Sequence, residues 1–206
     1  MSILDKVVAA VTPPESNEQR AEARAKARNA AHDGDWLSLV LDHHEQIEAA
    51  FAAVKGAKDA GSRINAQRRL GILLTGHSIA EETVIYPALV KAGEQAHSTK
   101  AYTEQSAAKV QMGLLEDLDP LSQDYLDKLE HIRGAVAHHV YEEEGNWFLD
   151  LQAKLPPADQ AKITFRYKEE FSRYTTNGEG ADADAVPPAI AGSRRSEGII
   201  STKTRN

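Results

Sequence analysis

The chain has no cysteine among its 206 residues. Disulfides, cysteine-ligated zinc, iron–sulfur clusters and thiol chemistry are therefore excluded, and any bound metal must be held by nitrogen and oxygen ligands. Cationic residues are also in deficit, since 24 Lys and Arg stand against 31 Asp and Glu and leave a formal net charge of -7. Such a charge provides no basic surface for nucleic acid or for an anionic membrane, so neither partner is expected.

Long apolar runs are missing as well. No stretch approaches the roughly 20 apolar residues of a membrane-spanning helix, and the amino terminus lacks a cationic region followed by a long apolar run. We therefore expect a cytoplasmic protein. Aromatic residues account for only 6% of the chain, whereas Ala, Leu, Glu, Lys and Arg, which are strong helix formers, are abundant. The composition predicts an all-α fold.

Apolar residues recur with helical spacing in four long segments. The predicted helices cover residues 36–54, 62–89, 98–118 and 122–151. Short connections between long helices are typical of antiparallel neighbours, so residues 36–153 are predicted to form an up-down antiparallel four-helix bundle. An apolar face that includes Tyr167 and Phe171 predicts an additional C-terminal helix at residues 157–175, which should cover the bundle from outside.

Both ends of the chain differ in composition from this central part. Residues 1–35 are predicted to form an N-terminal helical extension, in which residues 3–11 carry an apolar stripe. That stripe can bind a protein partner, or it can pack on its own domain or fray. Residues 15–31 combine Ala with charged residues and contain no large apolar side chain, which predicts a solvated spacer helix. Residues 176–206 are rich in Gly, Ala, Asp, Pro and Ser and are predicted to be a flexible tail.

A six-residue pattern, His-x-x-x-Glu-Glu, occurs twice, at residues 77–82 and 139–144. Each copy has an aromatic residue nine positions after its His, which is Tyr86 in the first copy and Phe148 in the second. Residues four apart lie on one face of a helix, so each copy can present one imidazole and one carboxylate to a shared point. Unpaired carboxylates are costly in a core, and the repeat therefore predicts a metal site inside the bundle. The four predicted ligands are His77, Glu81, His139 and Glu143.

The register of the pattern selects among neighbouring residues. His138 and Glu142 are also four apart, but only His139 paired with Glu143 puts the aromatic residue where the first copy has it. We therefore predict that His138 either lies beside the site or is a surface residue, and that it is not a ligand. Three further residues are candidates for orienting the ligands or shaping the pocket, with solvent exposure or core packing as the alternative: Glu82, Glu144 and Tyr86.

The first and third predicted helices occupy matching places in the repeat. His44 lies on the apolar stripe of the first helix, whereas the adjacent His43 lies off it, so His44 is the fifth predicted ligand. The interval from His44 to His77 is 33 residues, and the interval from Gln105 to His139 is 34. The third helix therefore has Gln105 where the first has a histidine.

In this pattern the chain resembles the hemerythrin-like HHE cation-binding domain family. The resemblance covers roughly residues 36–153 and rests on His44, on the two His-x-x-x-Glu pairs and on the segments that surround them. It implies a non-haem di-iron site in a four-helix bundle, with Glu81 and Glu143 as bridges between the metals.

The chain departs from that family on the third helix, where members usually supply a histidine and this sequence has Gln105. An amide oxygen is a poorer ligand for iron than imidazole. Either water fills the gap, or Gln105 or the adjacent Glu104 acts as a weak replacement ligand, or the second metal binds weakly. We expect two iron ions per chain, the second bound less tightly, although the ligand set also suits manganese or zinc.

A reduced di-iron centre with an open coordination position can bind dioxygen, nitric oxide or peroxide. The sequence therefore favours a protein that binds or reacts with such a small ligand in the handling of oxidative or nitrosative stress. Two alternatives remain open: a di-iron enzyme that consumes peroxide, and a metal-free helical module that binds a protein partner through its two end segments. No residue is assigned a catalytic role.

Overall fold

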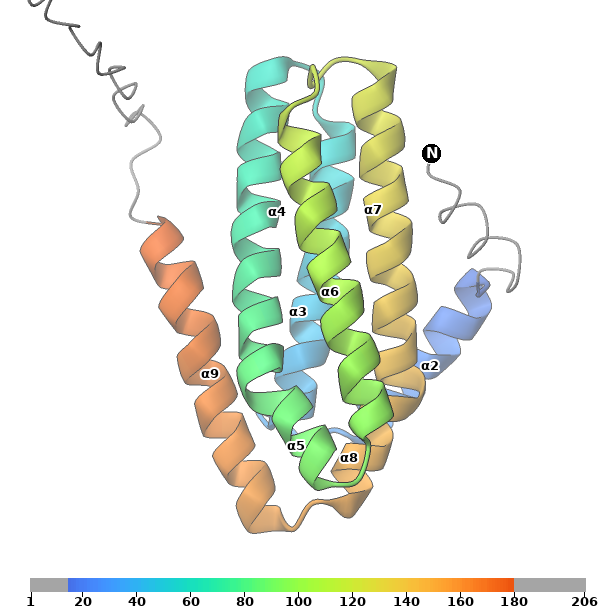
Figure 1. Cartoon of the computed structure of the whole chain (residues 1–206), viewed down its shortest axis with the longest axis vertical. Helices are drawn as coiled ribbons and strands as arrows, with labels where there is room; N and C mark the ends of the chain where they lie inside the picture. Colours follow the sequence, from blue (N-terminus) through green and yellow to red (C-terminus); the bar gives the residue numbers. More distant parts are fainter. Residues whose placement is uncertain (1–14, 180–206) are drawn as a thin grey trace, which may run out of the picture.

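A computed structural model describes residues 15–179 of the chain. Within that range the structure is all helical, which confirms the prediction of an all-α protein. Its elements are α2 (Asn17–Ala30), α3 (Trp36–Gly56), α4 (Ala60–Ala80), η1 (Glu81–Ile85), α5 (Tyr86–Lys91), α6 (Gln95–Glu116), α7 (Gln123–Glu142), η2 (Glu143–Trp147), α8 (Phe148–Lys154) and α9 (Pro157–Glu179) (Figure 1). The apolar stripe predicted at residues 3–11 and the predicted tail beyond residue 179 lie outside the described residues.

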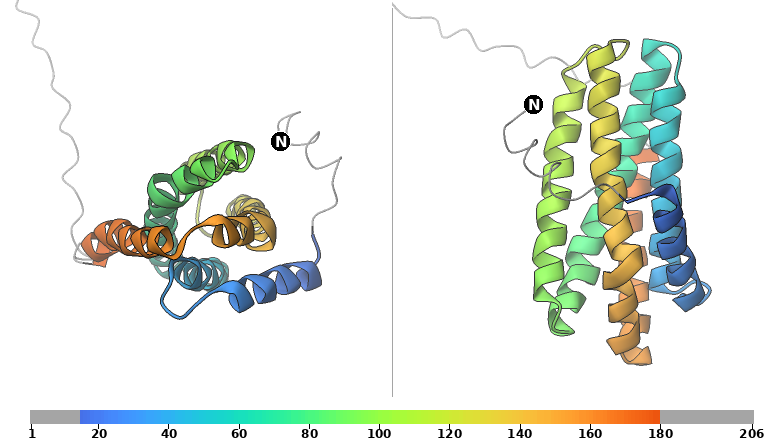
Figure 2. Two further views of the ribbon diagram at one scale, coloured as in Figure 1. Left: turned by 90° about the horizontal axis from the view of Figure 1, so that it is seen from below. Right: turned by 90° about the vertical axis from the view of Figure 1, so that its right-hand side faces the viewer.

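The four long helices α3, α4, α6 and α7 lie side by side as a bundle (Figure 1). α3 packs on α4, α6 packs on α7, and contacts between α3 and α7 join the two pairs. α9 lies along the outside of the bundle against α4 and α3, while α2 packs against α3 and η2 (Figure 2). Across residues 15–179, no helix combines the length and the apolar character that crossing a membrane requires.

Polar residues cap the starts of the helices. Ser16 and Gln19 form a capping box at the start of α2, in which each side chain accepts the backbone N–H of the other residue. The N-cap side chains of α3, α4 and α7 also accept a backbone N–H, and these are Asp35, Asp59 and Ser122. Each cap pairs a backbone donor that the first helical turn leaves without a partner, so the connections between the long helices can be short.

A layer of polar side chains divides the core into two parts. One cluster of buried apolar residues surrounds Trp36 and Phe148, at the end of the bundle where α5 and α8 lie. The other surrounds Phe51 and Tyr125 in the opposite half. Along α3, His44 lies between residues of the first cluster and residues of the second. The predicted ligands therefore occupy a level of the bundle with apolar packing on both sides.

The two helices that carry the repeated pattern are each interrupted by a wider, π-helical turn. η1 follows α4 and η2 follows α7. Each begins at the glutamate four residues after the histidine, and the residue that follows each is the aromatic one, Tyr86 or Phe148. The predicted helices over residues 62–89 and 122–151 are present as unbroken helical segments, but the helical spacing did not predict these wider turns within them. The internal repeat extends to the backbone, and turns of this kind are frequent at functional sites.

The two π-helical turns have different local surroundings. Pro87 follows the first turn; it has no N–H to donate, and its ring would clash with the carbonyl group four residues earlier in a regular helix. Gly145 lies within the second turn and faces α2, where an added Cβ would be 3.5 Å from Cβ of Ala23. That distance is an ordinary van der Waals contact, so α2 packs directly against the second turn.

The segments outside the bundle pack more closely than the sequence predicted. α2 is a helix with mostly exposed side chains, as predicted for residues 15–31, but it is more than a spacer, because it buries two alanines and directs Arg24 to the polar layer. α9 covers the bundle from outside and buries Tyr167 completely. It continues to Glu179, beyond the predicted end at residue 175.

Two glycines of α4 provide a test of how α9 packs on the bundle. A Cβ added at Gly71 would meet no atom within 4 Å, whereas one added at Gly76 would lie 3.0 Å from Cγ2 of Thr175 and 3.5 Å from the carbonyl oxygen of Phe171. Because glycine in a helix interior is less favourable than alanine, we expect Gly71→Ala to raise the free energy of unfolding by about 0.5–1 kcal/mol. Gly76→Ala should bring no gain. Urea denaturation measures the difference, and an equal gain in both variants would contradict the described contact.

Candidate metal centre

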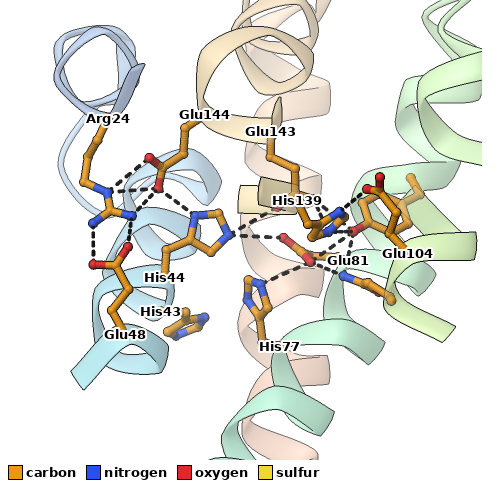
Figure 3. Close-up of polar contacts among 12 residues, drawn as sticks. Arg24, His43, His44, Glu48, His77, Glu81, Glu104, His139, Glu143 and Glu144 are labelled. Atoms are coloured by element: carbon orange, nitrogen blue, oxygen red, sulfur yellow. Dashed lines mark hydrogen bonds and ion pairs between the residues drawn. The ribbon is translucent and has the colours of Figure 1, made fainter. Parts of the chain in front are cut away.

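The structure brings the five predicted ligands into one buried layer. His44 comes from α3, His77 and Glu81 from α4 and its π-helical turn, and His139 and Glu143 from α7 and its π-helical turn (Figure 3). All five side chains are buried, and the two glutamates are fully buried. Carboxylates in such a layer need hydrogen-bond partners or a cation.

One half of the layer forms around His44 and His77, and we name it the first metal position. Nε2 of His44 lies 3.4 Å from Oε2 of Glu143 and 3.8 Å from Oε1 of Glu81. Nε2 of His77 lies 3.2 Å from Oε2 of Glu81. One ligand atom from each of these four residues lies within 4.8 Å of the others. The nitrogen and oxygen donors of this position suit iron, manganese or zinc.

Three atoms at the first metal position have no hydrogen-bond partner among the described residues: Nε2 of His44, Oε1 of Glu81 and Oε2 of Glu143. Buried polar atoms are almost always paired, and an unpaired one costs about 1–3 kcal/mol. Nδ1 of His44 donates to Glu144 at 2.8 Å, so Nε2 can present a lone pair to a metal. Three atoms that can each bind a metal, and that lie this close together, can share one cation.

The other half of the layer forms around His139, whose Nε2 lies 3.2 Å from Oε1 of Glu143. Glu143 thus directs one oxygen to His139 and the other to His44, as a carboxylate bridge between two metals does. Oε2 of Glu81 and the hydroxyl of Tyr86 lie in the same half. We name the group formed by His139, Glu81 and Glu143 the second metal position.

Gln105 is buried beside the second metal position, where the repeat predicted a weak ligand. It presents its amide nitrogen there: Nε2 donates to Oε2 of Glu81 and to Oη of Tyr86, both at 2.6 Å. An amide nitrogen that carries its protons has no lone pair for a metal. The adjacent Glu104 does not face the metal either, because its Oε2 accepts from the outer nitrogen of His139 at 2.8 Å. In this structure Gln105 therefore holds Glu81 and Tyr86 by hydrogen bonds, and Glu104 holds His139.

Two histidines of the layer are held by carboxylates on their outer nitrogens. Nδ1 of His44 donates to Glu144, and Nδ1 of His139 donates to Glu104, both at 2.8 Å. A carboxylate in this place fixes the orientation of the ring and leaves Nε2 available for a metal. Glu144 was predicted to face solvent or to orient a ligand, and it is buried against His44.

The outer nitrogen of His77 contacts α9. Its Nδ1 lies 3.1 Å from Oη of Tyr167, and the same hydroxyl oxygen lies 2.9 Å from Nδ1 of His43. The ring of His43 stacks on Phe171 with the ring centroids 3.6 Å apart, so His43 is engaged with α9. α9 was predicted only to cover the bundle. Its Tyr167 also orients one of the candidate ligands, a contact that the helical pattern gave no reason to expect.

Glu144 is itself held by α2. Nε of Arg24 lies 3.0 and 3.1 Å from the two carboxylate oxygens of Glu144, and the two terminal nitrogens of Arg24 donate to Glu48 on α3 at 3.0 and 2.8 Å (Figure 3). Because Glu144 is only 1% exposed, the guanidinium balances a charge that water cannot reach. Sequence reasoning missed Arg24, since nothing in a segment of alanine and charged residues marks the arginine that turns inward.

The electrostatics of the layer favour a cation. Burial, together with the nearby charge of Glu143, raises the pKa of the Glu81 carboxyl to about 7. Burial opposes a charge on His139, but Glu143 and Glu104 overcome it and raise the pKa of that imidazole to about 10. In the metal-free chain, protons therefore separate carboxylates that would otherwise repel each other. A bound cation can take the place of those protons.

Glu82 and His138, each predicted to lie either beside the site or at the surface, make contacts away from the layer. Oε1 of Glu82 accepts from Nζ of Lys109 on α6 at 2.5 Å. Nδ1 of His138 lies 2.9 Å from Oε2 of Glu15, just before the start of α2. The side chain of His138 is 44% exposed, so it contributes to the surface and not to the buried layer.

A cavity with a volume of about 1010 Å³ lies between α4, α6 and α7 and extends to the polar layer. His77, Gln105 and His139 form part of its wall, and the rest of the lining is mostly apolar. Small residues, among them Gly71 and Ala108, keep this part of the bundle open. A passage of this character suits a small uncharged ligand better than an ion.

Comparison with known proteins covers the same part of the chain. The family model described as Hemerythrin HHE cation binding domain matches residues 37–149, more than half of the chain. The chain is also similar to a "DNA nickase" of Nostoc sp. (strain PCC 7120 / SAG 25.82 / UTEX 2576), with 28% identity over 141 residues, which are 68% of this chain and 40% of that protein. It thus spans less than half the length of this relative. No solved structure matches the chain significantly. Both metal positions lie within the range of the family model.

Proposed function

Because the chain belongs to the hemerythrin HHE cation-binding domain family, we propose that it is a non-haem di-iron protein that binds or reacts with dioxygen, nitric oxide or peroxide. One observation carries the proposal. Three buried atoms of His44, Glu81 and Glu143 lie close together without hydrogen-bond partners in the described part of the chain. A metal ion pairs all three at once, whereas no single proton can.

The shared carboxylates support two metals in place of one. Glu143 directs Oε2 to His44 and Oε1 to His139. Glu81 directs Oε1 to His44 at the first position, while its Oε2 lies 3.2 Å from the hydroxyl of Tyr86 at the second. With two imidazoles and two carboxylates at the first metal position, a six-coordinate iron retains room for a small ligand. Iron bound there would supply the electrons that an oxidant accepts.

The surrounding residues have separate tasks in this proposal. Glu144, Tyr167 and Glu104 hold the imidazole rings by their outer nitrogens. The mostly apolar cavity gives a small ligand a route to the layer.

We also infer that the long helices alternate in direction as an up-down bundle, and that the protein acts in oxidative or nitrosative stress.

The name of the Nostoc relative suggests a different candidate function, which is action on DNA. Phosphate binding by proteins depends on clustered lysine and arginine side chains. The formal net charge of this chain is -7, and no observation on its described residues favours a nucleic-acid partner. The proposal therefore stays with a small ligand.

Iron analysis tests the proposal. We expect protein purified from iron-fed cells to contain between one and two iron ions per chain. The first metal position has two imidazoles and two carboxylates, whereas the second has only one imidazole. His44→Ala should lose most of this iron, while His131→Ala, which changes an exposed histidine of α7, should retain it. Well under one iron per unaltered chain would sink the metal hypothesis and favour a metal-free module.

Mixing the reduced protein with its candidate ligands separates binding from catalysis. A visible absorption band that forms with dioxygen or nitric oxide and disappears when the gas is removed supports reversible binding. Repeated consumption of peroxide without loss of the iron spectrum supports an enzyme. If none of the three ligands changes the spectrum of an iron-loaded sample, the proposed ligand chemistry is wrong although the metal site stands.

A further inference from the structure

The hydroxyl of Tyr86 lies within the second metal position. Its Oη is 2.9 Å from Oε1 of Glu143, 3.1 Å from Nε2 of His139 and 3.2 Å from Oε2 of Glu81. The side chain is fully buried, and Nε2 of Gln105 donates to the same oxygen at 2.6 Å. The three protein atoms that would bind a metal in this half therefore surround one phenol oxygen.

These separations are hydrogen-bond distances, and they also match the spacing of ligands around one metal ion. Metal–ligand bonds to nitrogen and oxygen are about 2.1 Å long, so two ligands at right angles on an ion are about 3 Å apart. Oη of Tyr86, Nε2 of His139 and Oε1 of Glu143 are separated from one another by 2.9, 3.1 and 3.2 Å. A single ion can contact all three atoms without a large movement of the backbone.

Protons hold this group together in the metal-free chain. The phenol of Tyr86 and Nε2 of Gln105 donate to the carboxylate oxygens. Nδ1 of His139 already donates to Glu104, so its Nε2 donates to Glu143 only when the ring is charged. A cation at this point can replace those protons and contact the same oxygen and nitrogen atoms.

The internal repeat provides an independent argument. It matches His44 with Gln105, and Phe148 with Tyr86. At the first metal position the histidine, His44, is present, and the aromatic residue near it is Phe148, with the ring centroids 6.4 Å apart. At the second metal position the amide of Gln105 stands in place of an imidazole. The aromatic residue there is Tyr86, whose hydroxyl contacts that amide. A ligand missing from α6 is thus matched by one gained at the start of α5.

From this geometry we propose that Tyr86 is a metal ligand, and that its phenolate oxygen completes the second metal position in place of the histidine absent from α6. The proposal rests on the proposed di-iron function and adds a ligand to that site. On binding, an oxygen–metal bond replaces the O–H bond and the proton passes to solvent. Gln105 is then a positioning residue, because its N–H donates to the phenolate oxygen and to Glu81.

Spectroscopy of the iron-loaded full chain tests the ligand directly. Phenolate bound to ferric iron absorbs strongly in the visible range, and Raman scattering excited in that band shows tyrosine ring vibrations. We expect both in the unaltered protein. Incorporation of ring-deuterated tyrosine should shift those vibrations, which identifies a tyrosine ligand without any substitution. This measurement decides the question even if a Tyr86 variant fails to fold.

Substitutions then identify the residue. Tyr86→Phe should lose the visible band and one of two iron equivalents, while the first metal position keeps its iron. Tyr102→Phe is the matched control: its ring lies 5.1 Å from that of Tyr86, but its hydroxyl bonds the backbone carbonyl of Glu82. It should retain the band and the iron. Gln105→Leu removes the donor to the phenolate and should shift the band without abolishing it.

The outcomes separate this proposal from the proposed function. Two iron ions per chain without a tyrosine-to-iron band would overturn Tyr86 as a ligand and leave the di-iron function in place. A band that persists in Tyr86→Phe would overturn it as well. Less than one iron per unaltered chain would overturn both proposals.

Discussion

Glu143→Ala is expected to release the iron of both metal positions, with a fall of more than about a hundredfold in the affinity of the chain for iron. Glu143 directs one oxygen to the first position and the other to the second, so its loss removes a ligand from each. Residues that merely orient a ligand typically change metal affinity by about 10–100-fold, and a ligand shared by two metals should exceed that. Titration with ferrous iron against a competing chelator measures the affinity.

Glu142→Ala is the matched control for this variant. Glu142 precedes Glu143 in the chain, but its carboxylate bonds Nζ of Lys100 outside the layer. Its removal takes away the same charge from the same helix and should leave iron affinity unchanged. Equal losses in the two variants would mean that the net charge of this region attracts iron, and that coordination by Glu143 contributes little.

The side chains of the polar layer were open to prediction because their relation is local. A separation of four residues puts His77 near Glu81 on any helix, whatever the rest of the chain does. The second copy of the pattern, with its aromatic residue in the same place, distinguished His139 from its neighbour His138. Fold class followed in the same way from composition and helical spacing, which are properties of single segments.

Other parts of the site depend on contacts between segments that are far apart in the sequence, and the helical spacing of residues does not predict those contacts. Tyr86 was a candidate for shaping the pocket, but its hydroxyl is placed among the ligands by the π-helical turn before it. Pro87 is a visible signal for that turn, because it has no backbone N–H to donate within a regular helix. The second turn contains no proline, so the sequence offers no comparable signal for it.

Arg24→Ala is expected to weaken iron binding by about 10–100-fold, although Arg24 contacts none of the five candidate ligands. Its guanidinium holds Glu144, and Glu144 holds the outer nitrogen of His44. Without Arg24, a carboxylate that is 1% exposed has only the imidazole to balance its charge. Glu144 should then draw the proton of His44 more strongly or turn toward solvent, and either change disturbs the ligand. The same chelator titration measures the loss.

Arg28→Ala separates this effect from the packing of α2. Arg28 lies one helical turn beyond Arg24 and also links α2 to α3, through Asp42 at 2.6 Å and Glu45 at 2.8 Å. Both of those carboxylates are about half exposed, and neither contacts a ligand. Both variants remove ion pairs between α2 and α3, but only Arg24 also pairs with Glu144 on η2 and so reaches His44. Iron affinity should fall in Arg24→Ala and stay unchanged in Arg28→Ala. An equal fall in both would mean that α2 affects the metal only by covering the bundle.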